Sequence, residues 1–268
     1  MKVVAHISDP HFGTEDPRVV AGLRADLDGH TGPLPALVVL SGDLTQRARS
    51  EQFRASRAFL DGLRCPHLVV PGNHDVPLYN VLRRFLDPLG TYRAHVTEDL
   101  SPTYVDDELA VVGIATAHGF TRKSGKVSPA QIAEATGALA GATTQWKVLV
   151  AHHPFVGPAA AQDDLVEDAE AALVAFRAAG VNVILTGHLH ISFSADAAMR
   201  DEAHRIVSVH AGTCTSTRTR GEPNNYNRLT FDNDELTVLV RAWDGTRFVD
   251  GDSKTYRRGA RELKKVDG

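Results

Sequence analysis

Three continuous apolar runs recur in the first half of the chain, and each is followed by a loop and a helix-like stretch. They read VVAHIS, ALVVLSGD and HLVVPGNHD, beginning at Val3, Ala36 and His67. Because the runs are continuous rather than alternating, they predict strands covered on both faces, as in a parallel sheet between helices. The pattern therefore predicts an α/β fold.

Capping residues mark where the intervening helices begin. Asp16 precedes Pro17, which suits an N-cap followed by the first helical position. Ser128 precedes Pro129 and has Gln131 at capping-box spacing. We expect helices from these positions and from about residue 50, so that helices alternate with strands.

The second half of the chain predicts a further set of strands. Residues 102–116 are expected to form a hairpin, and residues 147–154 and 181–190 are two more apolar strands. After His190 the strands become short and lack helical spacers, which predicts an antiparallel sheet there. Together these elements predict two mixed β-sheets flanked by helices.

No linker rich in proline or serine and no repeat of fixed period divides the sequence. We therefore expect a single domain over residues 1–250. Residues 251–268 are rich in charge and are expected to form a peripheral C-terminal tail.

Composition excludes several classes of protein. No apolar run approaches the roughly 20 residues of a membrane-spanning helix. Two cysteines, Cys65 and Cys214, are too few for a disulfide framework and fit a reducing compartment, so a cytoplasmic location is expected. The net charge is −4 without a basic block, so a nucleic-acid polymer is not an expected partner.

The predicted strands end in polar residues that can bind metal ions. In open α/β sheets, ligands bind at the carboxyl ends of strands, so these side chains are expected to converge on one pocket. The candidates are Asp9, His11, Asp43, Asn73, His74, His152, His188 and His190. They contain nitrogen and oxygen ligands only, which suits Mn, Fe or Zn.

Six or more ligands exceed what one tetrahedral ion needs. A pair of divalent ions that share one carboxylate accounts for them, and paired ions are the usual apparatus of phosphoester hydrolysis. Of the adjacent His152 and His153, only one can face the site, and His153 is expected to pack behind it. His188 and His190 are expected to lie two residues apart on one face of a strand.

Five motifs occur in order between residues 9 and 190. They are Asp-x-His at Asp9, Gly-Asp at Gly42, Gly-Asn-His-Asp at Gly72, His-x-Pro at His152 and Gly-His-x-His at Gly187. This series resembles the calcineurin-like metallophosphoesterases. The resemblance implies a four-layer α/β/β/α sandwich.

The resemblance also implies a role for each position. Asp9, His11 and His190 would hold one metal ion; Asn73, His152 and His188 would hold the other; and Asp43 would bridge them. His74 would hydrogen-bond or protonate at the phosphate, and Asp75 would orient His74. A protonated imidazole at this place contributes roughly 10²–10⁴-fold if it is a general acid.

The expected reaction is hydrolysis of a small-molecule phosphodiester by a hydroxide that bridges the two ions. The late loop around Arg218 and Arg220 is similar to that of bacterial class III cyclic nucleotide phosphodiesterases and glycerophosphodiesterases, which makes both arginines candidates for substrate binding. The sequence predicts neither the natural substrate, nor the physiological metal, nor the oligomeric state.

Three alternatives remain open at this stage. One is a pyrophosphohydrolase of the lipid A pathway, acting on a UDP-linked diacylglucosamine, which needs an apolar cleft for acyl chains. Only Leu78, Val81, Leu82, Phe85 and Leu86 could supply it, and core packing is the preferred interpretation of these residues. The second alternative is a phosphomonoesterase. The third is a non-enzymatic metal-binding scaffold, and the complete ligand set argues against it because a scaffold is expected to lose ligands.

Overall fold

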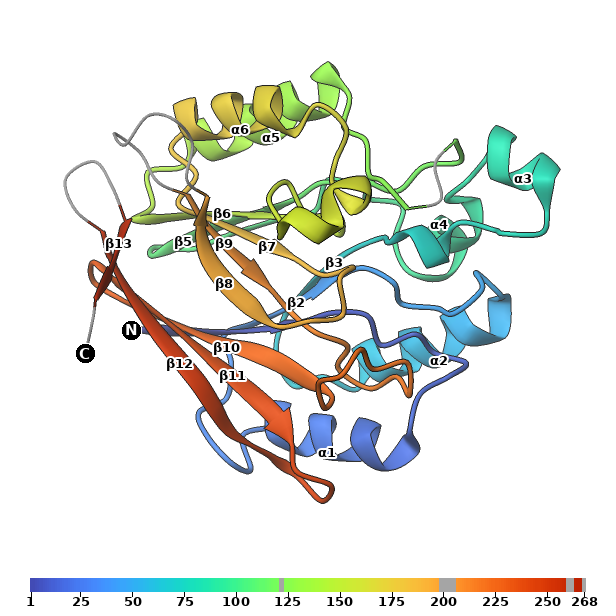
Figure 1. The fold of residues 1–268 in the computed structure, drawn as a ribbon, viewed down its shortest axis with the longest axis horizontal. Coiled ribbons are helices and arrows are strands. Elements are labelled where there is room, and N and C mark those ends of the chain that lie inside the picture. The colour runs from blue at the N-terminus through green and yellow to red at the C-terminus, as the bar shows by residue number, and fades with distance from the viewer. Residues whose placement is uncertain (121–122, 198–205, 259–262, 267–268) are drawn as a thin grey trace.

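The computed structural model describes residues 1–120, 123–197, 206–258 and 263–266. In this part of the chain, two β-sheets pack face to face, and helices cover both outer faces (Figure 1). The predicted four-layer α/β/β/α sandwich is confirmed.

The first sheet has the order β13-β12-β11-β10-β1-β2-β3. Its β1, β2 and β3 are parallel, and the late strands join antiparallel to β1. The strands are β1 (Lys2–Ile7), β2 (Leu37–Ser41), β3 (His67–Val70), β10 (Asn225–Asp232), β11 (Glu235–Trp243), β12 (Phe248–Arg258) and β13 (Leu263–Val266).

The second sheet has the order β4-β5-β6-β7-β9-β8. Its four central strands are parallel, and the two edge strands are antiparallel to their neighbours. The strands are β4 (Thr103–Val105), β5 (Leu109–Gly113), β6 (Trp146–Val150), β7 (Val183–Thr186), β8 (Phe193–Ala197) and β9 (Ile206–His210).

Helices α1 and α2 cover the first sheet, and α5 and α6 cover the second (Figure 1). The capping residues at Asp16 and Ser128 are confirmed, because each accepts a backbone hydrogen bond at the start of its helix. The helices are α1 (Pro17–Leu27), α2 (Ser50–Asp61), α3 (Val81–Leu86), α4 (Gly90–His95), α5 (Pro129–Gly141) and α6 (Ala169–Ala178), with 3-10 turns η1 (Asn73–Asp75) and η2 (Ala159–Asp164).

The continuous apolar runs are explained by the layers on either side of each strand. In β2, Val38 and Leu40 pack toward the helices, whereas Leu37 and Val39 pack between the sheets. In β6, Leu149 packs under the outer helices and Val148 packs between the sheets. Both faces of these strands are buried, which removes the alternation that a solvent-facing strand shows.

Two expectations about the late strands need correction. The strands after His190 do not form a sheet of their own: β8 and β9 extend the second sheet, and β10 to β13 extend the first. Residues 251–258, expected to belong to a charged tail, instead continue β12. The reason is Tyr256, which is buried between the sheets and donates to Ser194 Oγ at 2.8 Å. Residues 259–262 and 267–268 lie outside the described residues.

Candidate metal centre

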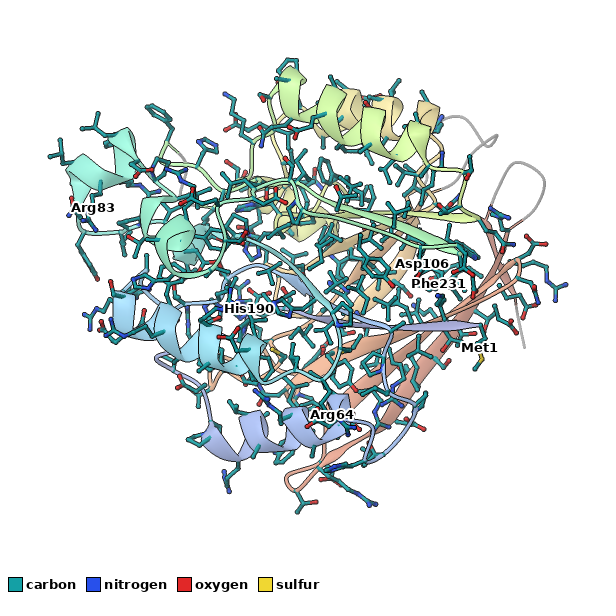
Figure 2. The ribbon with its side chains drawn as sticks, turned by 180° about the vertical axis from the view of Figure 1, so that it is seen from behind. Met1, Arg64, Arg83, Asp106, His190 and Phe231 are labelled. Carbon is teal, nitrogen blue, oxygen red and sulfur yellow. The ribbon has the colours of Figure 1, made fainter. Side chains whose placement is uncertain are left out.

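The predicted ligands lie together where parallel strands of both sheets end. The segments after β1, β2 and β3 in the first sheet meet the segments after β6 and β7 in the second. Backbone hydrogen bonds join them, since Asp9 N donates to Gly42 O at 3.1 Å and Gly187 N donates to His152 O at 3.1 Å. His190, labelled in Figure 2, is buried.

The first cluster consists of Asp9, His11, Asp43 and His190, all buried. The Oδ1 atom of Asp9 lies 3.2 Å from His190 Nε2 and 3.6 Å from His11 Nε2. His11 Nε2 also lies 3.6 Å from Asp43 Oδ2. Two imidazoles and two carboxylates therefore direct their ligand atoms at one point.

The second cluster surrounds the other oxygen of Asp43. Oδ1 of that carboxylate lies 3.4 Å from His152 Nε2, which in turn lies 3.0 Å from Asn73 Oδ1. His188 Nδ1 lies 3.3 Å from the same His152 nitrogen. The two oxygens of Asp43 thus face two different groups of ligands, which is the geometry of a bridging carboxylate.

Hydrogen bonds to backbone carbonyls orient two of the imidazoles. Nδ1 of His152 donates to Ser41 O at 2.8 Å, and Nδ1 of His190 donates to Arg218 O at 3.0 Å. Because a carbonyl can only accept, Nδ1 carries the proton in both rings, and Nε2 presents its lone pair to the centre.

Backbone strain is concentrated on the same residues. Eight non-glycine residues of the described chain have positive φ, and five of them are predicted ligands. Such a conformation costs on the order of 1–3 kcal/mol for each residue, so it persists only where the surroundings enforce it. The five are Asp9, His11, Asp43, His188 and His190, with φ between 47° and 70°.

The expectation that His188 and His190 lie on one face of a strand is wrong. β7 ends at Thr186, so His188 and His190 lie in the following loop and not on one strand face. Their left-handed backbone conformations, rather than strand alternation, direct one ring into each cluster.

The donor set fits two divalent cations. Among the described residues no hydrogen bond of acceptable geometry reaches Asp9 Oδ1, a buried carboxylate oxygen, although the Nε2 atoms of His190 and His11 lie 3.2 and 3.6 Å from it. Such a carboxylate needs a positive charge beside it, because burial without compensation is costly. Imidazole, carboxylate and amide ligands suit Mn, Fe or Zn.

The comparison with known proteins agrees with this geometry. The family model described as calcineurin-like phosphoesterase matches residues 2–192. The chain belongs to the calcineurin-like phosphoesterase family. The resemblance of its five motifs to that family is thereby confirmed.

One curated relative of this calcineurin-like chain is glycerophosphodiester phosphodiesterase GpdQ of Enterobacter lignolyticus. It is 36% identical over 81 residues, which are 27% of this chain and 29% of that protein. The chain therefore matches less than a third of the length of this relative.

Solved structures share the fold at low sequence identity. Purple acid phosphatase PPD1 of yellow lupin has a TM-score of 0.72 at 13% identity over 97% of this chain and 54% of its own. PhoD has a TM-score of 0.72 at 13% identity over 99% and 71%. Vps29 of Chaetomium thermophilum has a TM-score of 0.53 at 13% identity over 97% and 100%.

His74 lies at the edge of the phosphoesterase centre. Its backbone N donates to Asp43 Oδ1 at 2.8 Å, and its ring Nδ1 donates to Gln46 O at 2.9 Å. With Nδ1 protonated, Nε2 is the nitrogen left to meet a substrate. Burial lowers the pKa of His74, although the Asp43 charge opposes this effect.

Asp75 does not contact the His74 ring, contrary to the expected orienting role. Its carboxylate accepts from Leu44 N at 3.1 Å, Thr45 N at 2.9 Å and Gly72 N at 2.9 Å. The short 3-10 turn of residues 73–75 directs it toward the loop after β2. Burial, reinforced by the Asp43 charge, raises the pKa of Asp75 to about 7. Asp75 therefore connects the loops that hold Asp43 and Asn73.

Two further residues lie beside His188, namely His153, which is buried, and Asp164, which is half-buried. Neither has a role assigned by the motifs. His153 Nδ1 lies 2.8 Å from Thr116 Oγ1, and the centroids of the His153 and His188 rings lie 4.7 Å apart. His153, His152 and His188 also have ligand atoms within 4.8 Å of one another, so the expected packing role of His153 stays a prediction. Asp164 Oδ1 lies 3.6 Å from His188 Nε2, the nitrogen opposite the one in the centre. Asp164 was not predicted, because its loop carries no motif and reaches the site only through the fold.

A small cationic pocket opens beside His74. Its cavity volume is about 120 Å³, and its lining includes Gln46, Arg47 and Arg84. Arg218 donates from Nη1 to Gln46 Oε1 at 3.0 Å, so this candidate contacts a residue of the pocket lining. Arg220 is exposed and, through its charge, helps to lower the pKa of Asp164 after the larger effect of the His188 hydrogen bond.

Sequence reasoning missed Arg47 and Arg84 as pocket residues. For Arg47, the one feature of the sequence that could have indicated a place near the centre is its position four residues after Asp43. Arg84 gave none, because it lies in a segment whose apolar residues were expected to pack in the core.

The core-packing interpretation is wrong for four of its five residues, whereas the fifth, Leu78, is half-buried. Val81, Leu82, Phe85 and Leu86 are 48–76% exposed, and Arg84 is the buried residue of α3 at 7%. The helix is only six residues long and projects at one side of the molecule (Figure 1), too far from either sheet to bury an apolar face.

Proposed function

We propose that this calcineurin-like chain is a dinuclear metal-dependent phosphohydrolase that acts on phosphodiesters. The observation that carries the proposal is Asp43, whose two carboxylate oxygens face two separate groups of buried ligands. A protein that used the fold only as a scaffold would have no need for this buried and strained ligand set.

The proposed ligand sets follow the two clusters. Asp9, His11 and His190 would hold one cation, and Asn73, His152 and His188 the other, with Asp43 shared. When bound, two divalent cations supply neutralisation of phosphoryl charge and acidification of a water nucleophile.

The residues around the centre position the substrate and handle its protons. Gln46 O fixes the His74 ring, and His74 Nε2 would donate a proton to the leaving oxygen once it is itself protonated. Arg47 and Arg218 would contact the anionic phosphoryl oxygens, since both lie beside Gln46 at the pocket. A guanidinium matches two such oxygens at once.

One finding supports a diester rather than a monoester. The curated relative is named a glycerophosphodiester phosphodiesterase, and it is 36% identical to this chain over the 81 matched residues. Cyclic nucleotides and glycerophosphodiesters are the proposed substrate types.

We further propose that the protein acts in the cytoplasm on a small molecule. Cys65 and Cys214 are both free thiols, which suits a reducing compartment. Within the described part of the chain, no helix has the length and apolarity needed to cross a membrane.

The test compares two chromogenic esters. With Mn²⁺, purified protein should hydrolyse bis-(p-nitrophenyl) phosphate faster than p-nitrophenyl phosphate, and EDTA should abolish the activity. Activity confined to the monoester would replace the diesterase by a phosphomonoesterase. No turnover with any divalent ion would favour the scaffold.

A further inference from the structure

Helix α3 has its polar and apolar residues in the reverse of the usual places. Arg84 is buried, whereas its apolar neighbours in the helix face solvent. Ten large apolar side chains are exposed in the described residues, and six of them belong to α3 and its surroundings. We call these six the apolar rim: Tyr79, Val81, Leu82, Phe85, Leu86 and Phe120.

The apolar rim is one surface built from two segments. The rings of Phe85 and Phe120 lie 5.3 Å apart, although 35 residues separate them in the chain. Between them the backbones touch, because a Cβ added at Gly119 would lie 2.0 Å from Arg84 O. Glycine at this position thus permits the contact that joins the two segments.

The apolar rim continues directly from the cationic pocket. Leu78 and Arg84 line the pocket together with His74, and Tyr79 to Leu86 carry the rim onward. The pocket is small, with a cavity volume of about 120 Å³, and Leu78 in its lining directly precedes Tyr79 at the start of the rim. A phosphodiester whose ester group exceeds this pocket would extend that group from the arginine-lined pocket onto the apolar surface.

We propose that the apolar rim binds the hydrocarbon part of an amphiphilic phosphodiester substrate, whose phosphate occupies the pocket. The inference rests on the proposed function and specifies its substrate class. The protein surface matches such a substrate at both ends. Arg47 and Arg84 in the pocket lining suit the anionic phosphate, and the rim suits the hydrocarbon part.

A second copy of the chain is a poorer match, because six of the ten exposed large apolar side chains in the described residues belong to the rim itself. Of the other four, Val105 belongs to β4 and Val174 to α6, whereas Met1 and Leu34 lie outside the helices and strands. A second copy could cover the rim only by placing one rim against another.

The test measures kcat/KM with Mn²⁺ for p-nitrophenyl methyl phosphate and p-nitrophenyl octyl phosphate, below the concentration at which the octyl ester aggregates. We expect the octyl ester to exceed the methyl ester by about tenfold or more, because a longer chain covers more of the rim. In the double variant Leu82→Ser/Phe120→Ser this ratio should fall to about one. The matched control Leu34→Ser/Val174→Ser removes two exposed apolar side chains elsewhere and should keep the wild-type ratio.

A ratio near one in the wild type, or an unchanged ratio in the rim variant, overturns the proposal. If neither diester is hydrolysed, the proposed function fails, and the rim is then tested by calorimetry with octyl phosphate against methyl phosphate. Equal affinities for the two ligands overturn the rim independently of catalysis. A wild-type dimer that the rim variant converts to monomer in sedimentation, with no change in the ratio, assigns the rim to a second copy instead.

Discussion

In the metal centre the side chains of Asp9 and His152 are polar and fully buried, whereas around α3 those of Leu82 and Phe120 are apolar and 70–80% exposed. Both regions reverse the usual distribution, in which apolar groups are buried and charged groups face water. The buried carboxylates lower stability unless a cation compensates them, whereas the exposed apolar side chains cost little stability and leave their burial energy available to a ligand. The difference between the regions indicates which ligand: cations for the buried carboxylates and hydrocarbon for the exposed apolar side chains.

The largest expected effect comes from removing the carboxylate that we propose bridges the two cations. Asp43→Asn takes a charged ligand from both cations, so kcat/KM for bis-(p-nitrophenyl) phosphate should fall by roughly 10³-fold or more. Elemental analysis should find less than two metal ions per chain. The exposed Asp61→Asn is the matched control. Full occupancy by two metals in Asp43→Asn would show that this residue does not bridge.

Replacement of His74 tests the edge of the centre. His74→Ala should keep both metals but lose about 10²–10⁴-fold in kcat on diesters with poor leaving groups. The loss should be smaller for p-nitrophenol, a good leaving group that needs little protonation. An equal loss for both leaving groups would assign His74 to phosphate binding rather than to acid catalysis.

Asp164 tests whether the centre depends on residues outside its ligands. Asp164→Asn removes the carboxylate beside His188 Nε2, so metal affinity should fall by about 10–100-fold. Competition with a chromogenic chelator measures this affinity without turnover. The neighbouring Asp163→Asn is exposed and should leave it unchanged. Equal metal affinities in Asp164→Asn and Asp163→Asn would mean that Asp164 does not help to position His188, which its ring contacts then position alone.

Buried histidines behind the centre predict an acid-sensitive fold. Burial lowers the pKa of His6 and of His210 to about 3, so both are neutral in the folded chain, while the unfolded chain binds their protons near pH 6.5. The free energy of unfolding should therefore be at its full value above pH 6.5 and fall progressively toward pH 3.

The variant His210→Gln should reduce this acid sensitivity, because one of the two neutral imidazoles is gone. Urea unfolding at pH 7 and pH 5, with EDTA present throughout, measures the change. His30→Gln, at an exposed position, is the control and should keep the wild-type pH dependence. The same dependence in His210→Gln would assign acid sensitivity to other groups.

The smallest effect is expected from the apolar rim on stability. Leu82→Ser should change the free energy of unfolding by no more than about 0.5 kcal/mol, because the side chain is 70% exposed. Leu40→Ala, at a fully buried position, should lose about 2–5 kcal/mol. Urea unfolding compares the two leucines. A large loss from Leu82→Ser would mean that the rim stabilises the fold itself.

Much of the fold and centre could be predicted because local rules held there. Continuous apolar runs predicted β1, β2 and β6, and capping residues predicted α1 and α5. The late strands were assigned to the wrong sheet because strand partners are chosen by packing, which a single strand's sequence does not encode. Residues 251–258 of β12 were assigned to a tail because one buried residue, Tyr256, gives no periodic signal.

By itself, the sequence determined the layered α/β architecture, since only strands buried on both faces account for its apolar runs, and it determined which chemical groups stand at the strand ends. Tertiary structure alone decided how those groups meet. It directed the two oxygens of Asp43 to separate clusters, brought Asp164 to His188, and left α3 too short and too distant from the sheets to bury its leucines. The physical reason is that these outcomes depend on distances between segments far apart in the chain, whereas apolar patterns and caps act over a few neighbouring residues.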